Sequence, residues 1–465
     1  MYFLFYQPLL SKKQMSRVGN RSLFWYFLRN SRRINLMKKI ILLIAIVLIT
    51  TSCSNKERTE NKTIKIMYSS YVDFKRDYGS VIDEQFSNTN IEVIEYKSTM
   101  GEGIWDAMKY VPAGDRDWDI KKYIDIIKTE NPDILFFPSE AFPELQNENL
   151  LKELNVFLTE EEFTAGIDDN LLALLNEIGG GKIYAFPQSM TAQALFYNKD
   201  LFEKNGIAEP SDRMTWRELL LLAQRFSGNS DLKGLYTPYY DYADLLIEMG
   251  KADKRRWYDA SRQEVHFGTD SWKGLIADVV AAYSSGGMDD NGGIPIDLFS
   301  QGKVAMILET PYFMKQIQSM NPELNWGVVT EPVGTENSDV STTITYPIMS
   351  GISTNSQDYA TSSEVWKQLN NKRTAEMRFN SSIDKFTTPI RKLKPETDQD
   401  VFYVLNPAVN ILMERVSLNR ELKQKTDQVV NDGIQSAIVN PDSLNSIIDK
   451  MQEELRHVLY TTEQK

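Results

Sequence analysis

The chain has 465 residues, of which 64 are acidic and 52 basic, and its formal net charge at pH 7 is −12. Residues 1–52 contain nine of the basic residues and no acidic one. Position 53 onward therefore has 43 basic against 64 acidic residues, a net charge of −21. This balance argues against nucleic acid and anionic lipid as partners, because both are bound through basic patches. With one cysteine and two histidines, thiolate zinc sites, histidine-rich metal sites and disulfide frameworks are excluded, and we expect no metal and no cofactor.

A short apolar run lies just before the only cysteine. Lys38 and Lys39 precede an unbroken apolar stretch at 40–49, and small or hydroxylated residues follow up to Cys53. A positive start, an apolar run of this length and small residues before a cut are the layout of a secretory signal, whereas a membrane span needs about 20 apolar residues. Residues 37–52 therefore resemble a bacterial lipoprotein signal peptide, with Cys53 as the lipidated N-terminal residue.

This interpretation leaves alternatives open. Thr50 departs from the lipoprotein pattern, in which the third residue before the cysteine is usually a leucine. An uncleaved anchor that ends near an incidental cysteine is the alternative. Residues 1–36 fit neither pattern, and we interpret them as an over-extended gene start, the alternative being a real cytoplasmic extension. Residues 53–62 are polar and charged, and we expect them to form a flexible, lipidated tether.

After the tether, strand and helix patterns alternate. The stretches TIKIMYSSY at 63–71 and IEVIEYK at 91–97 predict two strands with a helix between them. The stretch NPDILFFPSE at 131–140 is a short apolar run between turn residues, which is typical of a buried parallel strand. Strands and helices in alternation indicate an α/β fold, and the chain length predicts two or more domains.

Two helices are marked by local signals in the middle of the chain. Asp200 is expected to cap a short helix that stops at Gly206, because glycine adopts the left-handed conformation that ends helices. Thr215 and Glu218 form a T-x-x-E capping box, which predicts the start of a second helix.

The same region carries a family pattern. Residues 179–206 contain G-K-x-Y-A-x-P followed by L-x-Y-N-K-D-L-F-x-x-x-G, and T-W-x-E follows at 215–218. Further blocks come in order, LFSQGKVAMILETPYF at 298–313 and NWGVVTEPVG at 325–334. Together these blocks resemble the family 1 extracellular solute-binding proteins, the maltodextrin-type receptors of ABC importers, over most of 63–390.

The resemblance implies a two-lobed, periplasmic-binding-protein-like α/β fold, whose lobes are joined by hinge crossings and close around a ligand in the cleft between them. Mapping the family's chain path predicts crossings near 188–194, 341–350 and 385–392. It assigns residues 63–190 plus 348–388 to the N-terminal lobe, and residues 191–347 plus 389–465 to the C-terminal lobe.

The implied function is that of a receptor without enzymatic activity. We expect a monomer, anchored by lipid to the extracytoplasmic face of the cell membrane, that captures a carbohydrate or oligosaccharide and delivers it to the permease subunits of an ABC transporter. The alternatives are a receptor for a peptide or another polar solute, a surface glycoside hydrolase with paired carboxylates, and a cell-surface interaction protein.

Aromatic rings stack on the apolar face of a sugar, and carboxylates and amides bind its hydroxyl edge. The stretch YTPYYDY at 236–242 offers both groups, although an interfacial strand is its structural alternative. Glu140 has the alternative of a solvated loop residue, and Trp216 and Tyr197 are expected to pack rather than bind. The candidate ligand-binding residues, all in loops that the family's chain path brings to the cleft, are Ser70, Tyr71, Glu140, Gln188, Thr191, Tyr239, Tyr240, Asp241, Tyr242 and Tyr312.

Overall fold

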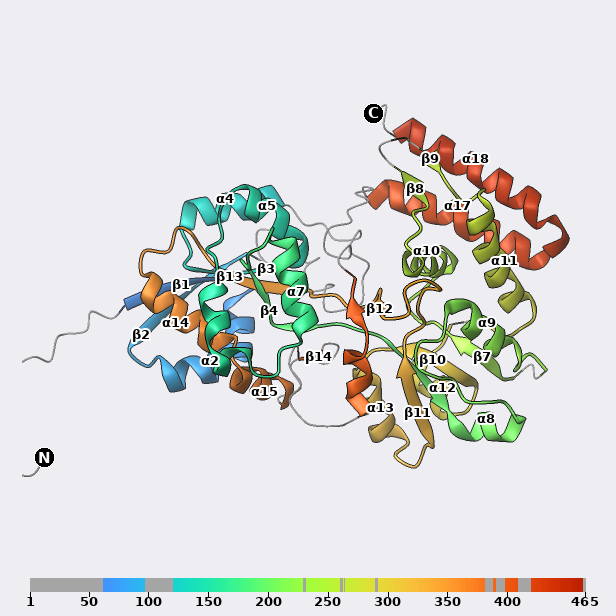
Figure 1. The fold of residues 1–465 in the computed structure, drawn as a ribbon, viewed down its shortest axis with the longest axis horizontal. Coiled ribbons are helices and arrows are strands. Elements are labelled where there is room, and N and C mark those ends of the chain that lie inside the picture. The colour runs from blue at the N-terminus through green and yellow to red at the C-terminus, as the bar shows by residue number, and fades with distance from the viewer. Residues whose placement is uncertain are drawn as a thin grey trace, which may run out of the picture. The chain divides into compact units, whose positions relative to one another are not determined.

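The structure is a computed structural model (Figure 1). Cys53, the signal peptide and nearly all of the tether lie outside the residues that it describes, as does most of the predicted crossing near 385–392. Among the described helices, none has the length and apolar character needed to cross a membrane. The described residues are 62–96, 120–228, 231–259, 262, 264–288, 292–380, 388–389, 398–408 and 420–462.

A first sheet of five strands confirms the predicted α/β architecture. Three strands at one side of the sheet are parallel, since β1 pairs in parallel with both β2 and β3. The later strand β13 runs antiparallel to β3 and to β4, so a segment from far downstream completes the sheet. The strand order is β2 (Thr89–Glu95), β1 (Lys62–Tyr68), β3 (Ile134–Pro138), β13 (Ile348–Ile352) and β4 (Phe186–Pro187).

Helices from distant parts of the sequence lie around this sheet. In Figure 1, α2 lies beside α14 and α15, which contact it. The elements around the first sheet are α2 (Tyr71–Gln85), α4 (Ile120–Glu130), η3 (Ser139–Ala141), α5 (Phe142–Asn147), η4 (Asn155–Thr159), α6 (Glu161–Thr164), α7 (Asp169–Ile178), α14 (Tyr359–Leu369) and α15 (Lys372–Asn380).

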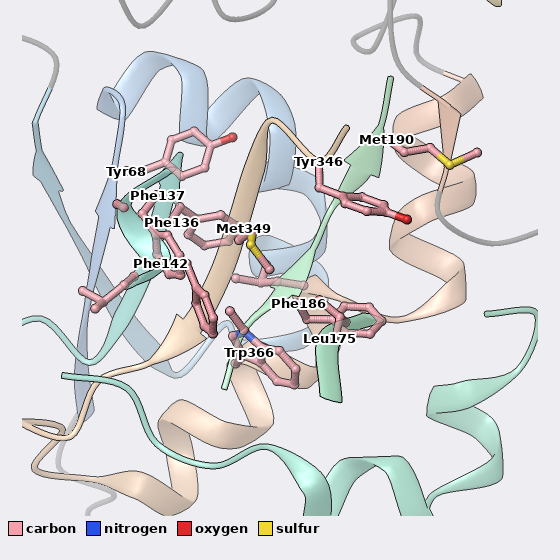
Figure 2. Close-up of a cluster of buried hydrophobic side chains, with 14 of the residues drawn as sticks. Tyr68, Phe136, Phe137, Phe142, Leu175, Phe186, Met190, Tyr346, Met349 and Trp366 are labelled. Carbon is pink, nitrogen blue, oxygen red and sulfur yellow. The ribbon is translucent and has the colours of Figure 1, made fainter. Parts of the chain in front are cut away.

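An aromatic core fixes these layers together, as Figure 2 shows. Trp366 on α14 is fully buried, and its ring lies edge-on to Phe186 of β4 and tilted against Phe157, with centroids 6.3 and 5.1 Å apart. The indole N–H of Trp366 donates to the Ser350 hydroxyl at 3.1 Å, so the buried polar atom is satisfied. The late helix α14 is thereby attached to strands β4 and β13.

A second sheet of four strands has its own helices, and a second hydrophobic core packs against it. Other residues of its strands, such as Phe196 and Ile307, belong to the hydrophobic cluster of the first sheet. Strand β10 runs antiparallel to β6 and parallel to β7, and β11 runs antiparallel to β6. The strand order is β11 (Trp326–Thr330), β6 (Ala194–Asn198), β10 (Val304–Glu309) and β7 (Lys233–Tyr236).

The C-terminal helices α17 and α18 lie side by side in Figure 1 and contact α11, and α17 also contacts α10. The elements that follow or cover the second sheet are α8 (Lys199–Asn205), α9 (Trp216–Gln224), α10 (Tyr242–Ala252), β8 (Tyr258–Asp259), β9 (Glu264–Val265), α11 (Asp270–Ser284), α12 (Pro295–Ser300), α13 (Tyr312–Met320), η5 (Asp398–Tyr403), α17 (Arg420–Val439), η6 (Pro441–Ser443) and α18 (Leu444–Thr462).

The chain passes from the first sheet to the second between residues 187 and 194, and it returns between residues 330 and 348. These two crossings pair with each other, since Thr191 and Thr345 exchange backbone hydrogen bonds of 2.8 and 3.0 Å. Short strands lie along them: β5 (Ser189–Met190) pairs with β14 (Thr388–Pro389), and β12 (Val340–Ser341) pairs with β15 (Asn406–Pro407). The residue boundaries assigned to the two lobes stay a prediction.

The helix signals in the middle of the chain are confirmed except for one. Thr215 and Glu218 form the predicted capping box of α9, and Gly206 ends α8 with φ of 61°. The cap of α8 is Asn198, however, whose side chain accepts the Leu201 N–H at 3.1 Å. The prediction of Asp200 was wrong because the helix already begins at Lys199, two residues earlier than a cap at Asp200 implies, and Asp200 instead accepts a hydrogen bond from Asn325 at 2.7 Å.

We predict that Asn198→Ala lowers the free energy of unfolding by about 1 kcal/mol, the usual effect of removing an N-cap. Asp200→Ala should have a smaller effect, because it removes one exposed hydrogen bond. Urea denaturation of both variants measures the difference, and a larger loss for Asp200→Ala would contradict the assigned cap.

Candidate ligand-binding site

The predicted binding residues lie at the carboxyl edges of the two sheets. In the first sheet, β1 and β3 are parallel, so the residues after Tyr68 and after Pro138 emerge at the same edge. In the second sheet, β7 and β10 are parallel neighbours, and the antiparallel strand β6 starts at their common edge. Ligands of open α/β sheets bind outside the carboxyl ends of the strands, so these edges are the candidate site.

A buried carboxylate lies at the edge of the second sheet. Glu309 ends β10 and is 2 % exposed, and its Oε2 accepts the Tyr239 hydroxyl at 2.9 Å and the Thr310 N–H at 3.0 Å. Burial raises the pKa of Glu309 to about 7, although these two hydrogen bonds oppose the shift. Burial, together with the charge of Glu309, also raises the pKa of Tyr239. The pair can offer hydrogen-bonding atoms to a ligand at this edge.

Other tyrosines extend this edge. Tyr236 ends β7 opposite Ile307 of β10, and its hydroxyl donates to the Gly293 carbonyl at 3.3 Å. Tyr312, half-buried, begins α13 three residues after Glu309. Tyr239 therefore contacts Glu309, and helix α13, which begins with Tyr312, follows the end of the same strand, β10.

Tyr240 contacts the first crossing. Its hydroxyl donates to Oε1 of Gln193 at 2.9 Å, and Gln193, 3 % exposed, immediately precedes β6. The side-chain amide nitrogen of Gln193, Nε2, is buried without a hydrogen-bond partner in the described part of the chain. Buried polar groups are nearly always paired, so this nitrogen is a candidate donor to a ligand.

The remaining residues of the tyrosine stretch have structural contacts. Asp241 caps α10, where its carboxylate accepts the Asp244 N–H and the Asn431 side chain, both at 2.8 Å. The ring of Tyr242 packs edge-on against Tyr283 at 4.9 Å. A ligand contact for Asp241 or Tyr242 stays a prediction.

At the edge of the first sheet, hydrogen bonds and ion pairs fix the residues after β1. Ser70 caps α2 and hydrogen-bonds the Asp73 carboxylate at 2.5 Å, and Arg76 pairs with Asp73 and Asp77 at 2.8 and 2.7 Å. Tyr71 is half exposed, and its backbone N–H donates to Glu95 at 2.7 Å. A hydrogen bond therefore fixes the backbone of Tyr71 at this edge, and its side chain remains half exposed.

Glu140, Gln188 and Thr191 occupy the remaining predicted positions. Glu140 is half-buried in η3, directly after β3. The Gln188 amide accepts the Tyr78 hydroxyl at 2.6 Å and donates to Ser350 at 3.0 Å and to Asn370. The hydroxyls of Thr191 and Thr345 are 2.5 Å apart. Gln188 and Thr191 thus have partners within the protein, and their ligand contacts stay predictions.

Sequence reasoning missed Glu309 and Gln193. The signal for Glu309 was its place at the end of the apolar run VAMIL, before T-P-Y. Gln193 carried no comparable signal. No group of three or more metal-ligating side chains comes together within the described ranges.

The chain is similar to a known protein family. Residues 108–360, more than half of the chain, match the family of bacterial extracellular solute-binding proteins. The chain belongs to this family. A binding protein of Brucella abortus (strain 2308) is 24 % identical over 306 residues, which cover 62 % of this chain and 70 % of that protein. The melibiose/raffinose/stachyose-binding protein MelE of Bacillus subtilis is 21 % identical over 197 residues, 39 % of this chain and 45 % of MelE.

Solved structures share the fold. The sugar-binding protein MalE of Xanthomonas citri superposes with a TM-score of 0.59 at 13 % identity, covering 87 % of this chain and 98 % of MalE. A cyclo/maltodextrin-binding protein in complex with maltotetraose gives a TM-score of 0.54 at 15 % identity, covering 86 and 98 %. The two-lobed, periplasmic-binding-protein-like fold predicted from the sequence is therefore confirmed.

We predict that Glu309→Gln reduces the pH dependence of stability between about pH 4.5 and 7. Below pH 4.5, the ordinary pKa of a glutamate, the wild-type carboxyl is protonated in both folded and unfolded chains. Between 4.5 and about 7 the unfolded chain loses this proton while the folded chain keeps it, so the free energy of unfolding falls as the pH rises. The glutamine has no proton to lose, and equal slopes for both proteins in urea denaturation would contradict the assignment.

Proposed function

We propose that this protein is a lipid-anchored receptor that captures an oligosaccharide outside the cytoplasm and delivers it to an ABC permease. Membership of the extracellular solute-binding family supports the capture of a solute outside the cell. The observation that carries the carbohydrate assignment is the Glu309–Tyr239 pair, with its buried carboxylate, at the sheet edge where β7 ends with Tyr236 and α13 begins with Tyr312.

This combination suits the chemistry of a sugar. Carboxylate, amide and phenol groups exchange hydrogen bonds with hydroxyls, and a ring covers the apolar C–H face. Two similar proteins support the same ligand class: MelE, which is named for melibiose, raffinose and stachyose, and a protein of the same fold whose structure contains maltotetraose. In our proposal, Tyr71 and Glu140 at the edge of the first sheet contact the same ligand across the cleft.

The direct test uses a soluble form that starts at residue 54, screened by thermal shift and calorimetry with raffinose, stachyose, maltotetraose and a peptide mixture. A bound sugar at 100 times its Kd stabilises the fold by about 2.7 kcal/mol. A response to peptides alone would replace the carbohydrate assignment. Chromatography of the sugars after long incubation tests for hydrolysis, and cleaved products would identify an enzyme instead.

We predict that Tyr312→Ala weakens binding of the sugar found in this screen by more than tenfold, since truncating a central aromatic contact costs about 2 kcal/mol and 1.4 kcal/mol is a factor of ten. Tyr312→Phe should cost much less, because stacking needs the ring and not the hydroxyl. Calorimetry measures both affinities. Tyr460→Ala, which removes an exposed tyrosine of α18, is the control and should bind normally. Equal losses for Phe and Ala would show that the hydroxyl makes the contact.

We predict that Cys53 is the N-terminal residue of the mature protein and carries lipid. Cys53→Ala should accumulate as an unprocessed precursor and should not incorporate a labelled fatty acid, because the acylated thiol is absent. Mass spectrometry of the mature N-terminus is the check, and an unmodified Cys53 in the wild-type protein would refute the anchor.

A further inference from the structure

A buried glutamate contacts the second crossing at the point where it leaves the second sheet. Glu331 directly follows β11 and is 2 % exposed. Its Oε1 accepts the backbone N–H groups of Thr342 and Thr343 at 2.9 and 3.4 Å. Its Oε2 accepts the hydroxyl of Thr343. One carboxylate therefore holds two consecutive residues of the crossing against the end of a sheet strand.

The same threonine reaches the first crossing. The Thr343 hydroxyl oxygen accepts the backbone N–H of Gln193 at 2.9 Å, and Gln193 is the residue before β6. Because β6 pairs with β11 in the second sheet, the relay Glu331–Thr343–Gln193 connects both crossings to the starts or ends of two neighbouring strands. Glu331 and Thr343 are both buried, so water does not compete for the hydrogen bonds of the relay.

The first sheet holds the other end of the first crossing. Gln188 is bonded to Tyr78, Ser350 and Asn370. Between the two attachments lie residues 189–192 of the first crossing and 344–347 of the second, which pair through Thr191 and Thr345. A hinge needs only a few residues whose backbone angles change, and these short stretches are bounded by fixed points on both sides.

We propose that Glu331 is a positioning residue that fixes the pivot of the two crossings against the second sheet, with Thr343 extending this attachment to the first crossing. Loss of the relay would let the bending spread into residues 341–343 and 193. The two sheets would then sample a wider range of orientations even without a ligand.

The test needs no ligand, so it stands apart from the carbohydrate assignment. Spin labels at Glu130→Cys and Gln424→Cys, two exposed positions on α4 and α17, report the distance distribution between the two parts in the soluble form that starts at residue 54. We expect Glu331→Ala to broaden this distribution. Glu331→Gln should restore it, because the amide oxygen still accepts the two N–H groups and the amide nitrogen can donate to the Thr343 oxygen.

Thr343→Val separates the relay from general destabilisation. In Thr343→Val, hydrogen exchange should show lost protection at the backbone N–H of Gln193, while the backbone N–H of Thr342 stays protected. In Glu331→Ala, both backbone N–H groups should lose protection. Ser362→Ala is the control for the loss of a buried polar group away from the crossings, since the Ser362 hydroxyl is fully buried on α14 and hydrogen-bonds Ser356 at 2.9 Å, and it should leave the distribution unchanged. If Glu331→Ala does not fold, Thr343→Val decides alone. A wild-type distribution together with a protected Gln193 amide in Thr343→Val would overturn the proposal.

Discussion

The pairing of two chain segments that are far apart in sequence is the constraint on which the rest of the structure depends. Thr191 and Thr345 exchange backbone hydrogen bonds, and the chain can make this pair only if it leaves the first sheet, builds the second and returns. The return delivers β13 into the first sheet, between β3 and β4. The first sheet is therefore complete only after the chain has built the second sheet and returned, which couples the folding of the first sheet to that of the segment between the crossings.

The same constraint positions the candidate site. Since the crossings connect to β4, β6 and β13, they lie at the edges where β1, β3, β7 and β10 end. Residues after those strands share the edge with the hinge. In our proposal, a ligand bound there would touch loops of a sheet and lie beside the proposed hinge residues, an arrangement that suits closure around a ligand. The Tyr240–Gln193 hydrogen bond is a direct example of this proximity.

The buried carboxylates of the two sheets, among the described residues, have different kinds of partner. Asp73 and Asp77 at the first sheet both form ion pairs with Arg76. Glu309 and Glu331 at the second sheet accept hydrogen bonds from neutral groups instead, and burial raises the pKa of each to about 7. Neutral donors compensate a buried charge less well than a cation does. Both glutamates thus lower stability in their ionised form, a cost that proteins tolerate where a side chain serves function rather than folding.

The sequence by itself determined the features that depend on neighbours along the chain. The α9 capping box, the stop at Gly206 and the buried strand of 134–138 follow from local hydrogen bonding, backbone freedom and apolar runs, and the family blocks identified the fold. The cap of α8 was placed two residues away from Asn198, because Asn and Asp are equally good caps and only the path out of β6 decides between them. The tertiary structure alone brought Glu309 to Tyr239, Gln193 to Tyr240 and Glu331 to Thr343. These contacts depend on strand register and on the pairing of the crossings, which are set by packing between distant segments and leave no periodic pattern in the sequence.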